Sequence, residues 1–267
     1  MKIIITGSRG FIGHNLSVFL EKKNIKVLGY DLKNLKNPKI FKKNYLENID
    51  GVIHLAGVSR VSSSINQPIK TLNANIILTT RILEAIKKTK KKPWFMFAST
   101  HQIKFDKNFK QFTPYSISKE TCENIICFYS NNYKIKSFIM RFTDIFGLKN
   151  YDEHKILGIL INNFKKNKSV NIKTPNHYLN FVDIKDLSKL ILSTIKKKFK
   201  TNLSILNIES NNRIKLIKFA RQLKKAMNST SKIITQENTI KKKINNSITE
   251  KIIKLNLNVD KIIKENF

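Results

Sequence analysis

The sequence of 267 residues is poor in cysteine, glycine and acidic residues. Its two cysteines, Cys122 and Cys127, are five residues apart, which on a helix places them roughly 140° apart and on different faces. No second pair and no nearby histidine accompany them, so we expect neither a zinc site nor a disulfide framework, and no metal. We interpret them as small helix residues in a protein of a reducing compartment.

Long hydrophobic runs are also missing. No apolar stretch would form a signal peptide or a membrane span, and the chain runs directly into a strand-like KIIIT segment at 2–6. A hydrophobic content of 41% over this length is nevertheless enough for a buried core. We therefore expect a cytoplasmic globular protein without a membrane partner.

Acidic residues number only 18 against 51 basic ones, which gives a net charge of +33. Such a surface favours anionic ligands. Only six of the basic residues are arginine, however, and the lysines are scattered along the whole chain, whereas surfaces that read nucleic acid favour arginine. Lysine, asparagine and isoleucine are all abundant and share A/T-rich codons. We attribute the charge to that bias and do not expect a nucleic-acid partner.

Short apolar runs alternate with helical patterns through the first half of the chain. The runs lie at 2–6, 25–31, 50–57, 93–100 and 136–142, and the helical patterns lie at 11–22, 69–88 and 115–130. Buried strands that alternate with helices predict an α/β fold. In it a doubly wound (Rossmann) parallel sheet carries helices on both faces and binds ligands at the carboxyl ends of its strands.

The pattern changes after about residue 147, where shorter elements are joined by polar loops. We predict a dinucleotide-binding domain over 1–147 that also takes in about 180–210. The remainder, 148–267, is expected to form a smaller, partly interleaved α/β lobe that binds the substrate.

Three of the eight glycines, Gly7, Gly10 and Gly13, stand directly after the first predicted strand. This spacing allows a tight turn and lets a pyrophosphate rest on the N-terminus of the following helix. The second strand ends at Asp31, 18 residues past Gly13, where a carboxylate can accept both ribose hydroxyls of an adenosine. Because it would repel a 2′-phosphate, we predict NAD as the cofactor and disfavour NADP.

A tyrosine stands four residues before a lysine in TPYSISK (113–119). About one residue in six is lysine, so the seven tyrosines should give roughly one such pair by chance; two occur, Tyr115/Lys119 and Tyr151/Lys155. Positions i and i+4 share a helix face. The spacing alone does not decide which pair is functional.

The order of the glycine loop, HLAG (54–57) and YSISK (115–119) resembles an extended short-chain dehydrogenase/reductase of the NAD-dependent epimerase/dehydratase family, which acts on nucleotide sugars. The match is strong from residue 1 to about 147 and weaker beyond. Other matching stretches are DGVIHLAG (50–57), SINQP (64–68) followed by Asn75, FAST (97–100), RFTDIFG (141–147) and NFVDIKDLSKLIL (180–192).

The resemblance implies a catalytic set of Thr100, Tyr115 and Lys119, with Tyr115 as general acid and base. Tyr151 follows the loop after Gly147 and lacks such a partner, so Tyr151/Lys155 is interpreted as the chance pair. The residues implied to bind the cofactor are Gly7, Arg9, Gly10, Phe11, Ile12, Gly13, Asp31, Leu32, Leu55, Ala56, Gly57, Asn75, Tyr115, Lys119 and Thr143.

Several positions depart from the family pattern. His101 and Gln102 replace the Asp-Glu pair of 4,6-dehydratases, which makes dehydration unexpected. Leu179 stands where many members carry an arginine for the diphosphate. Residues 40–50 are too few for the crossover helix that usually precedes the fourth strand, so we expect a trimmed adenine pocket, with Asn44 or Tyr45 against the base.

These features predict an NAD-dependent nucleoside-diphosphate-sugar epimerase. A keto-sugar reductase of the same fold that uses NAD(P)H is a first alternative. A degenerate member that binds dinucleotide and acts as a regulatory or nucleic-acid-binding protein is a second. The resemblance also implies a homodimer formed through helices 69–88 and 115–130.

Overall fold

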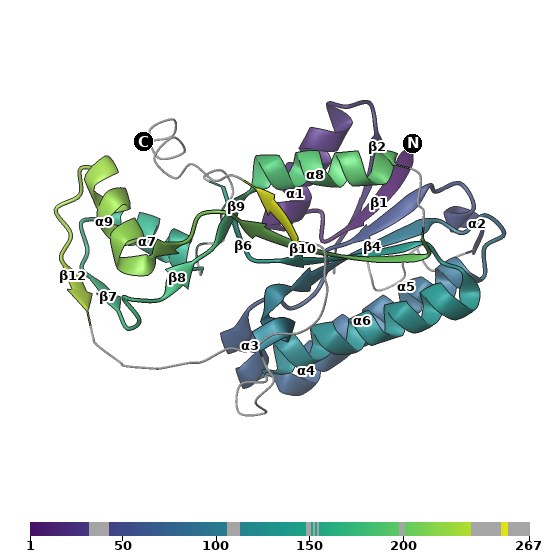
Figure 1. Cartoon of the computed structure of the whole chain (residues 1–267), viewed down its shortest axis with the longest axis horizontal. Helices are drawn as coiled ribbons and strands as arrows, with labels where there is room; N and C mark the ends of the chain where they lie inside the picture. Colours follow the sequence, from purple (N-terminus) through teal and green to yellow (C-terminus); the bar gives the residue numbers. More distant parts are fainter. Residues whose placement is uncertain are drawn as a thin grey trace. The chain divides into compact units, whose positions relative to one another are not determined.

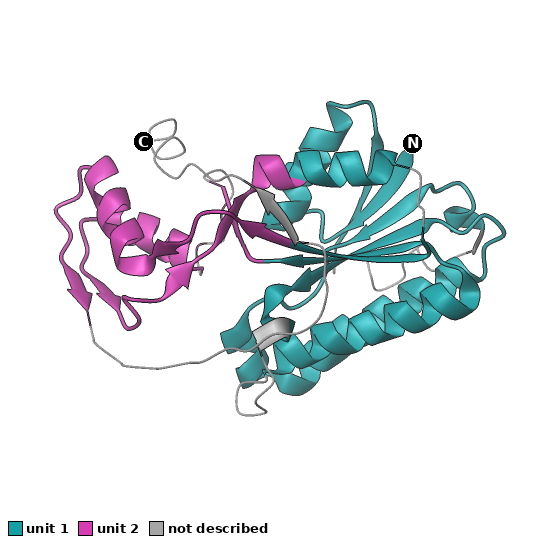
Figure 2. Cartoon of the chain, in the orientation of Figure 1, with its two compact units in different colours: residues 1–142, 188–207, 250–252 teal, residues 143–187, 208–249, 253–267 magenta. Residues whose placement is uncertain are grey.

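The structure, a computed structural model, describes residues 1–31, 43–105, 113–147, 151, 153, 155–197, 201–235 and 252–255. The chain forms two compact units (Figure 2). Unit 1 comprises Met1–Phe142, Ser188–Asn207 and Glu250–Ile252, and unit 2 comprises Thr143–Leu187, Ile208–Thr249 and Ile253–Phe267. Neither unit is a continuous piece of chain.

Unit 1 is built on a seven-stranded sheet in the order β13-β10-β5-β4-β3-β1-β2 (Figure 1). The strands β2, β1, β3, β4 and β5 pair in parallel, and Ile4 in β1 lies between Leu28 of β2 and Val52 of β3. The strands of the sheet are β1 (Lys2–Thr6), β2 (Lys26–Tyr30), β3 (Gly51–His54), β4 (Trp94–Thr100), β5 (Ser137–Phe142), β10 (Leu203–Ser210) and β13 (Ile252–Leu255).

Helices cover both faces of this sheet. In Figure 1, α1 and α8 lie on one face, and α5 and α6 lie on the other. The helices of this part of the chain are α1 (Phe11–Glu21), α2 (Lys43–Leu46), α3 (Val61–Asn66), α4 (Pro68–Leu72), α5 (Leu78–Lys87), α6 (Pro114–Tyr133) and α8 (Ile184–Lys196). The predicted doubly wound parallel sheet is confirmed. Its strands are continuous apolar runs because both faces are buried, and Ile3, Ile4 and Ile5 are fully buried.

The helix expected over 69–88 is divided. A π-helical segment, η3 (Asn73–Ile77), separates α4 from α5. A π segment is one residue wider per turn than an α-helix and is found mostly at functional sites. Here it contains the buried Asn75, whose amide bonds the main chain of Val58. Hydrophobic periodicity did not predict this segment, whose Asn75 bonds a loop residue 17 positions earlier.

Local sequence explains where α6 begins. Thr113 is extended at the N-cap, its hydroxyl accepts from the N–H of Ser116, and the Ser116 hydroxyl accepts from the N–H of Thr113. This capping box, followed by Pro114 in the first turn, fixes the first residue of the helix. Tyr115 therefore lies in the first turn of α6, with Lys119 one turn further along.

Between β2 and β3, the described residues contain only the four-residue helix α2. This agrees with the expected lack of a crossover helix. Any strand before it, within 32–42, lies outside the described residues.

Unit 2 has its own core, in which the rings of Phe146, Phe181 and Phe219 pack with centroids 5.0–6.4 Å apart. Its shorter elements are β6 (Asp144–Phe146), α7 (Ile156–Lys165), β7 (Val170–Ile172), β8 (Tyr178–Leu179), β9 (Phe181–Asp183), β11 (Ile214–Lys215), α9 (Leu216–Ala226) and β12 (Ile233–Thr235). Across the described part of the whole chain, no helix combines the length and apolar character needed to span a bilayer.

Candidate functional site

The glycine loop forms a tight cradle between β1 and α1. Gly7 has φ +73°, a left-handed conformation that favours glycine, and a Cβ added to it would lie 2.8 Å from the Ala56 nitrogen. A Cβ on Gly13 would lie only 2.1 Å from the Gly7 carbonyl oxygen. Gly10 begins α1 without a side chain to cap it, and the first turn contains no acidic residue. The helix N-terminus thus offers N–H groups to an anion, flanked by Phe11 and Ile12.

Asp31 follows β2 directly and closes one side of this cradle. Its carboxylate accepts from the Ser8 hydroxyl at 2.7 Å and from the Arg9 main-chain N–H at 3.2 Å. The Asp31 side chain is 19% exposed, so it retains a surface toward solvent. The Arg9 guanidinium lies 3.9 Å away, but it is largely exposed. Leu32, the next predicted contact, lies outside the described residues.

A buried histidine, His54 at the end of β3, joins β1, the strand before the cradle, to helix α5. His54 Nδ1 lies 2.6 Å from the Thr6 hydroxyl, which also accepts from the Ala56 N–H at 3.2 Å. His54 Nε2 lies 3.0 Å from the Thr79 hydroxyl, which in turn donates to the Asn75 carbonyl. These partners require the proton on Nε2.

Complete burial lowers the pKa of His54 to about 3, with a smaller contribution from the Lys119 ammonium. The imidazole is therefore neutral near pH 7.

Asn75 lies between Val58, which follows β3, and Ser118 of helix α6. Its Oδ1 accepts from the Val58 N–H at 2.7 Å, and its Nδ2 donates to the Val58 carbonyl and to the Ser118 hydroxyl. Ser118 donates in turn to the Tyr115 carbonyl at 2.7 Å. Gly57 lies so close that a Cβ there would be 2.6 Å from Asn75 Oδ1. Hydrogen bonds through Asn75 therefore connect Val58, directly after the loop of Leu55, Ala56 and Gly57, to Ser118 of α6.

The three predicted catalytic residues belong to unit 1. Thr100 is the buried last residue of β4, and its hydroxyl accepts from the Gln102 N–H at 3.2 Å. The Lys119 ammonium donates to the Ala98 carbonyl of the same strand at 2.7 Å. Tyr115 is half-buried, one turn before Lys119. α6 thus presents its tyrosine and lysine at the carboxyl end of β4.

Lys119 is a buried cation, 5% exposed, whose Nζ lies 4.4 Å from the centre of the Phe97 ring. Burial lowers its pKa to about 8, while the Cys122 thiol and the Glu123 carboxylate act in the opposite direction. The ammonium has three donors, and the Ala98 carbonyl takes one of them. The others can serve a ligand or the tyrosine oxygen.

Unit 2 contains the predicted cofactor contact Thr143 and the chance pair Tyr151/Lys155. The Thr143 hydroxyl lies 3.3 Å from the Ile208 carbonyl and 3.4 Å from Asn180 Oδ1. Tyr151 precedes α7 and bonds Asn162 at 3.2 Å, whereas Lys155 is the N-cap of that helix. Tyr151 and Lys155 therefore do not share a helical turn, unlike Tyr115 and Lys119.

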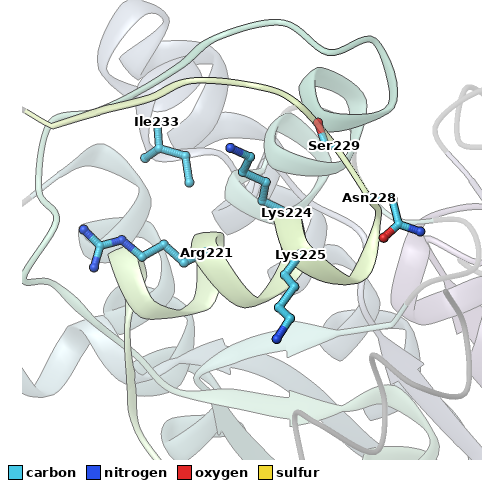
Figure 3. A pocket seen from close by; sticks show the side chains of 6 residues that line it. All are labelled: Arg221, Lys224, Lys225, Asn228, Ser229 and Ile233. Carbon is cyan, nitrogen blue, oxygen red and sulfur yellow. The ribbon is translucent and has the colours of Figure 1, made fainter.

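Unit 2 also carries a hollow of about 460 Å³, which α9 and the start of β12 line (Figure 3). Its cations are Arg221, Lys224 and Lys225. In Figure 3 Lys224 and Lys225 point to opposite sides of α9, so the cations do not converge on one anion. Lysines in the last turn of a helix are also what its dipole favours. We therefore place the candidate site at the sheet edge of unit 1.

Comparison with known proteins identifies the family of the chain. The family model for the NAD dependent epimerase/dehydratase family matches residues 3–208. The chain belongs to this family. The resemblance of the glycine loop, HLAG and YSISK to this family is thereby confirmed.

Two curated relatives illustrate the similarity. The family member is 33% identical over 241 residues to a dTDP-D-glucose 4,6-dehydratase of Dictyostelium discoideum, with 72% of this chain and 55% of that protein covered. It is 32% identical over 182 residues to an uncharacterized UDP-glucose epimerase of Bacillus subtilis, with 55% and 57% covered. The chain spans a little over half the length of these two relatives.

Solved structures agree with the fold. A UDP-glucose 4-epimerase of Thermotoga maritima with UDP-glucose matches with a TM-score of 0.75 and 22% identity, over 88% of this chain and 85% of that one. A UDP-glucuronic acid 4-epimerase of Bacillus cereus with UDP-glucuronic acid and NAD matches with a TM-score of 0.75 and 21% identity, over 88% and 86%. The epimerase/dehydratase family member therefore has their Rossmann architecture.

Sequence reasoning missed several residues of the site. The sequence motifs gave no role to His54, Thr6, Thr79 or Ser118, which the structure joins by hydrogen bonds. Glu123 carried a usable signal, because it continues the four-residue spacing of Tyr115 and Lys119 along one face of α6.

Proposed function

We propose that this protein is an NAD-dependent enzyme that epimerises a nucleoside-diphosphate sugar. The observation that carries the proposal is that unit 1 combines a glycine cradle at the N-terminus of α1 with a tyrosine and a buried lysine at the end of β4. The cradle fits a dinucleotide, because its glycines leave room where a Cβ would collide and its helix N-terminus favours a pyrophosphate. Family membership supports the same cofactor.

NAD, when bound, supplies a hydride acceptor and donor. The chain provides the proton chemistry. Tyr115 takes the proton of a sugar hydroxyl as the alcohol becomes a ketone, and it returns a proton after the keto-sugar has turned its other face. Thr100 donates a hydrogen bond to the same oxygen. The Lys119 charge favours the phenolate form of Tyr115.

Asp31 supports NAD over NADP. Its carboxylate faces the cradle and is already held by Ser8 and Arg9, so it can accept ribose hydroxyls without rearrangement. A 2′-phosphate placed there would meet a fixed negative charge. Two neighbours of known structure were solved with NAD and UDP-glucuronic acid, which favours the same kinds of ligand here.

Dehydration is not part of the proposal, although one relative is named as a 4,6-dehydratase. In place of an acidic pair after Thr100, this chain has His101 and Gln102. His101 Nδ1 lies 3.0 Å from the Phe142 carbonyl, which can only accept, so that nitrogen carries the ring proton. The Gln102 amide cannot act as a carboxylate base. The product is expected to keep all its hydroxyl groups.

The decisive experiment incubates the protein with UDP-, dTDP-, GDP- and CDP-sugars, with and without added NAD(P)H, and follows products by NMR. Epimerisation without added reductant is the expected result, and consumption of NADPH would instead favour the reductase. Tyr115→Phe should lower turnover by about 10²–10⁴-fold. Tyr151→Phe, the matched control from the chance pair, should leave turnover unchanged.

Dinucleotide binding without turnover of any sugar would favour the regulatory alternative. Unchanged turnover in Tyr115→Phe would contradict the assigned chemistry. Substrate selection is assigned to unit 2, which includes Thr143 and the Leu179 position.

A homodimer is part of the proposal. Helix α6 packs along α4, η3 and α5, and this helical layer exposes apolar side chains at its surface. Ile69 is 74% exposed and Phe128 is 50% exposed, and Ile117 lies on the same face of α6 as Phe128, eleven residues away. A second copy of the same layer is the occupant that would bury this surface.

We also infer a cytoplasmic location. Cys122 and Cys127 are both free thiols on α6. Unpaired cysteines are typical of proteins in a reducing compartment such as the cytoplasm, where this enzyme would act on its nucleotide sugar.

A further inference from the structure

A buried ion pair lies one helical turn beyond Lys119 on α6. The Arg141 guanidinium donates to both oxygens of the Glu123 carboxylate, with Nε at 3.0 and 3.1 Å and Nη2 at 2.7 Å. The Ser99 hydroxyl donates to the same carboxylate. The Glu123 and Arg141 side chains are only 6% and 11% exposed. This cluster of Ser99, Glu123 and Arg141 joins α6 to two neighbouring strands.

The cluster has a fixed relation to the candidate site. Tyr115, Lys119 and Glu123 follow one another at four-residue intervals and share a face of α6. On the sheet, Ser99 pairs with Arg141 and immediately precedes Thr100. If α6 rotated or slid, Arg141 and Ser99 would lose their hydrogen bonds to the Glu123 carboxylate. The cluster therefore fixes the position of α6 along β4, and with it the hydrogen bond from Lys119 to the Ala98 carbonyl.

Stability alone does not explain such a pair. Replacing a buried ion pair by packed apolar residues is often neutral or even stabilising, because two charges must lose their water. The lysine next to it does need a negative neighbour, since its ammonium is buried against an aromatic ring. The charged and titratable groups that face Lys119 are the Tyr115 phenol, Cys122 and Glu123 on its own helix, His54 from β3 and, one strand further away, Arg141 from β5.

We propose that Glu123 is a positioning residue of this site, whose carboxylate, fixed by Arg141 and Ser99, holds Lys119 on β4 and keeps its ammonium charged. The role rests on the proposed function, in which the charge of Lys119 favours the phenolate of Tyr115. His54 is neutral and Cys122 is a buried thiol whose pKa is raised, so Glu123 is the anion among the groups named above. Its loss should make Lys119 release its proton at lower pH.

The test follows the titration of Lys119 directly, by NMR of protein labelled with ε-¹³C lysine. The ring of Phe97, 4.4 Å from Nζ, should shift the Lys119 signal away from those of the other lysines. The signal is assigned by its absence from Lys119→Arg. In Glu123→Gln the midpoint should fall by about one pH unit, a tenfold change in the protonation equilibrium. Glu120→Gln is the control: it removes a negative charge from the residue next to Lys119 in the sequence and should leave the Lys119 midpoint unchanged.

Glu123→Gln leaves the Arg141 charge buried without its partner, so folding is checked by circular dichroism. The double variant Glu123→Gln/Arg141→Gln removes both charges and leaves no buried ion unpaired. It should lower the Lys119 midpoint in the same direction by a smaller amount. A wild-type titration in the folded double variant would overturn the proposal, whatever the single variant does.

This measurement needs neither substrate nor turnover. Failure to find a sugar substrate would refute the proposed function while leaving the titration to decide the role of Glu123. If turnover is found, the alkaline limb of its pH profile should move down with the Lys119 midpoint. A uniform loss of rate with an unmoved limb would indicate a purely structural role and contradict the proposal.

Discussion

Replacing Gly13 by alanine tests whether the cradle is as tight as described. The new Cβ would lie 2.1 Å from the Gly7 oxygen and 2.8 Å from both the Gly7 carbonyl carbon and the Ser8 Cα. All three are backbone atoms, so no side-chain rotation can relieve the contact, and α1 must move away from the loop. Overpacking of this kind costs about 3 kcal/mol, the upper end of its usual range. Because Gly13 lies in a helix, alanine would otherwise be favoured by about 1 kcal/mol.

The net expectation is a loss of about 2 kcal/mol in the free energy of unfolding. Urea unfolding followed by the fluorescence of Trp94 measures it in unit 1, since this single tryptophan is buried in β4. Gly10→Ala is the matched control. Gly10 has φ −70° and ψ 166°, and its Cβ would lie 3.2 Å from the Gly7 oxygen, so its cost should stay near 0.5 kcal/mol, about that of a poorer N-cap. If Gly13→Ala were as stable as wild type, the close approach of α1 to the loop would be refuted.

Three further outcomes are expected. Asp31→Asn should improve the affinity for NADP relative to NAD by at least about tenfold in calorimetric titrations, because it removes the charge that would repel a 2′-phosphate; an unchanged ratio would rule out that role. The folded-state pKa of His54, about 3, lies below its ordinary 6.5, so its stabilisation is complete above pH 6.5 and is lost as the pH falls toward 3. Between pH 6.5 and 5 wild type should therefore lose about 2 kcal/mol more than His54→Gln, and equal losses would show that the histidine is not held neutral. Ile69→Glu should sediment as a monomer, whereas Ile159→Glu, which changes another exposed isoleucine on α7 of unit 2, should remain dimeric like wild type; monomeric wild type would contradict the dimer.

The parts of the fold that could be predicted are those with local causes. The alternation of apolar strands and amphipathic helices indicated a doubly wound parallel sheet, because each strand is buried on both faces. The start of α6 follows from Thr113, Pro114 and Ser116 within a few residues. The glycine loop was recognisable because its causes are local. Gly7 adopts the left-handed conformation of the turn after β1, and Gly13 lets α1 approach that turn closely.

The parts that escaped prediction depend on contacts between distant residues. Asn75 in the π segment bonds Val58, 17 residues earlier, and the tautomer of His54 depends on Thr6 and Thr79, 48 and 25 residues away. No periodicity records such contacts. Only one member of the Glu123–Arg141 pair could be predicted from the sequence. Glu123 continues the four-residue spacing of Tyr115 and Lys119 on a helix. Its partner Arg141 is identified only from the structure, which aligns Ser99 and Arg141 in neighbouring strands.

The interleaving of the two units has a consequence for biosynthesis. Segment 188–207 belongs to unit 1, yet residues 143–187 of unit 2 precede it in the chain. As the polypeptide leaves the ribosome, β5 is therefore exposed before β10 exists to cover its outer edge. At roughly 5–20 residues per second, the 60 residues between them, 143–202, take several seconds to appear. During that interval the nascent chain carries an uncovered strand edge, which makes it a candidate for chaperone binding before it can ever meet a cofactor.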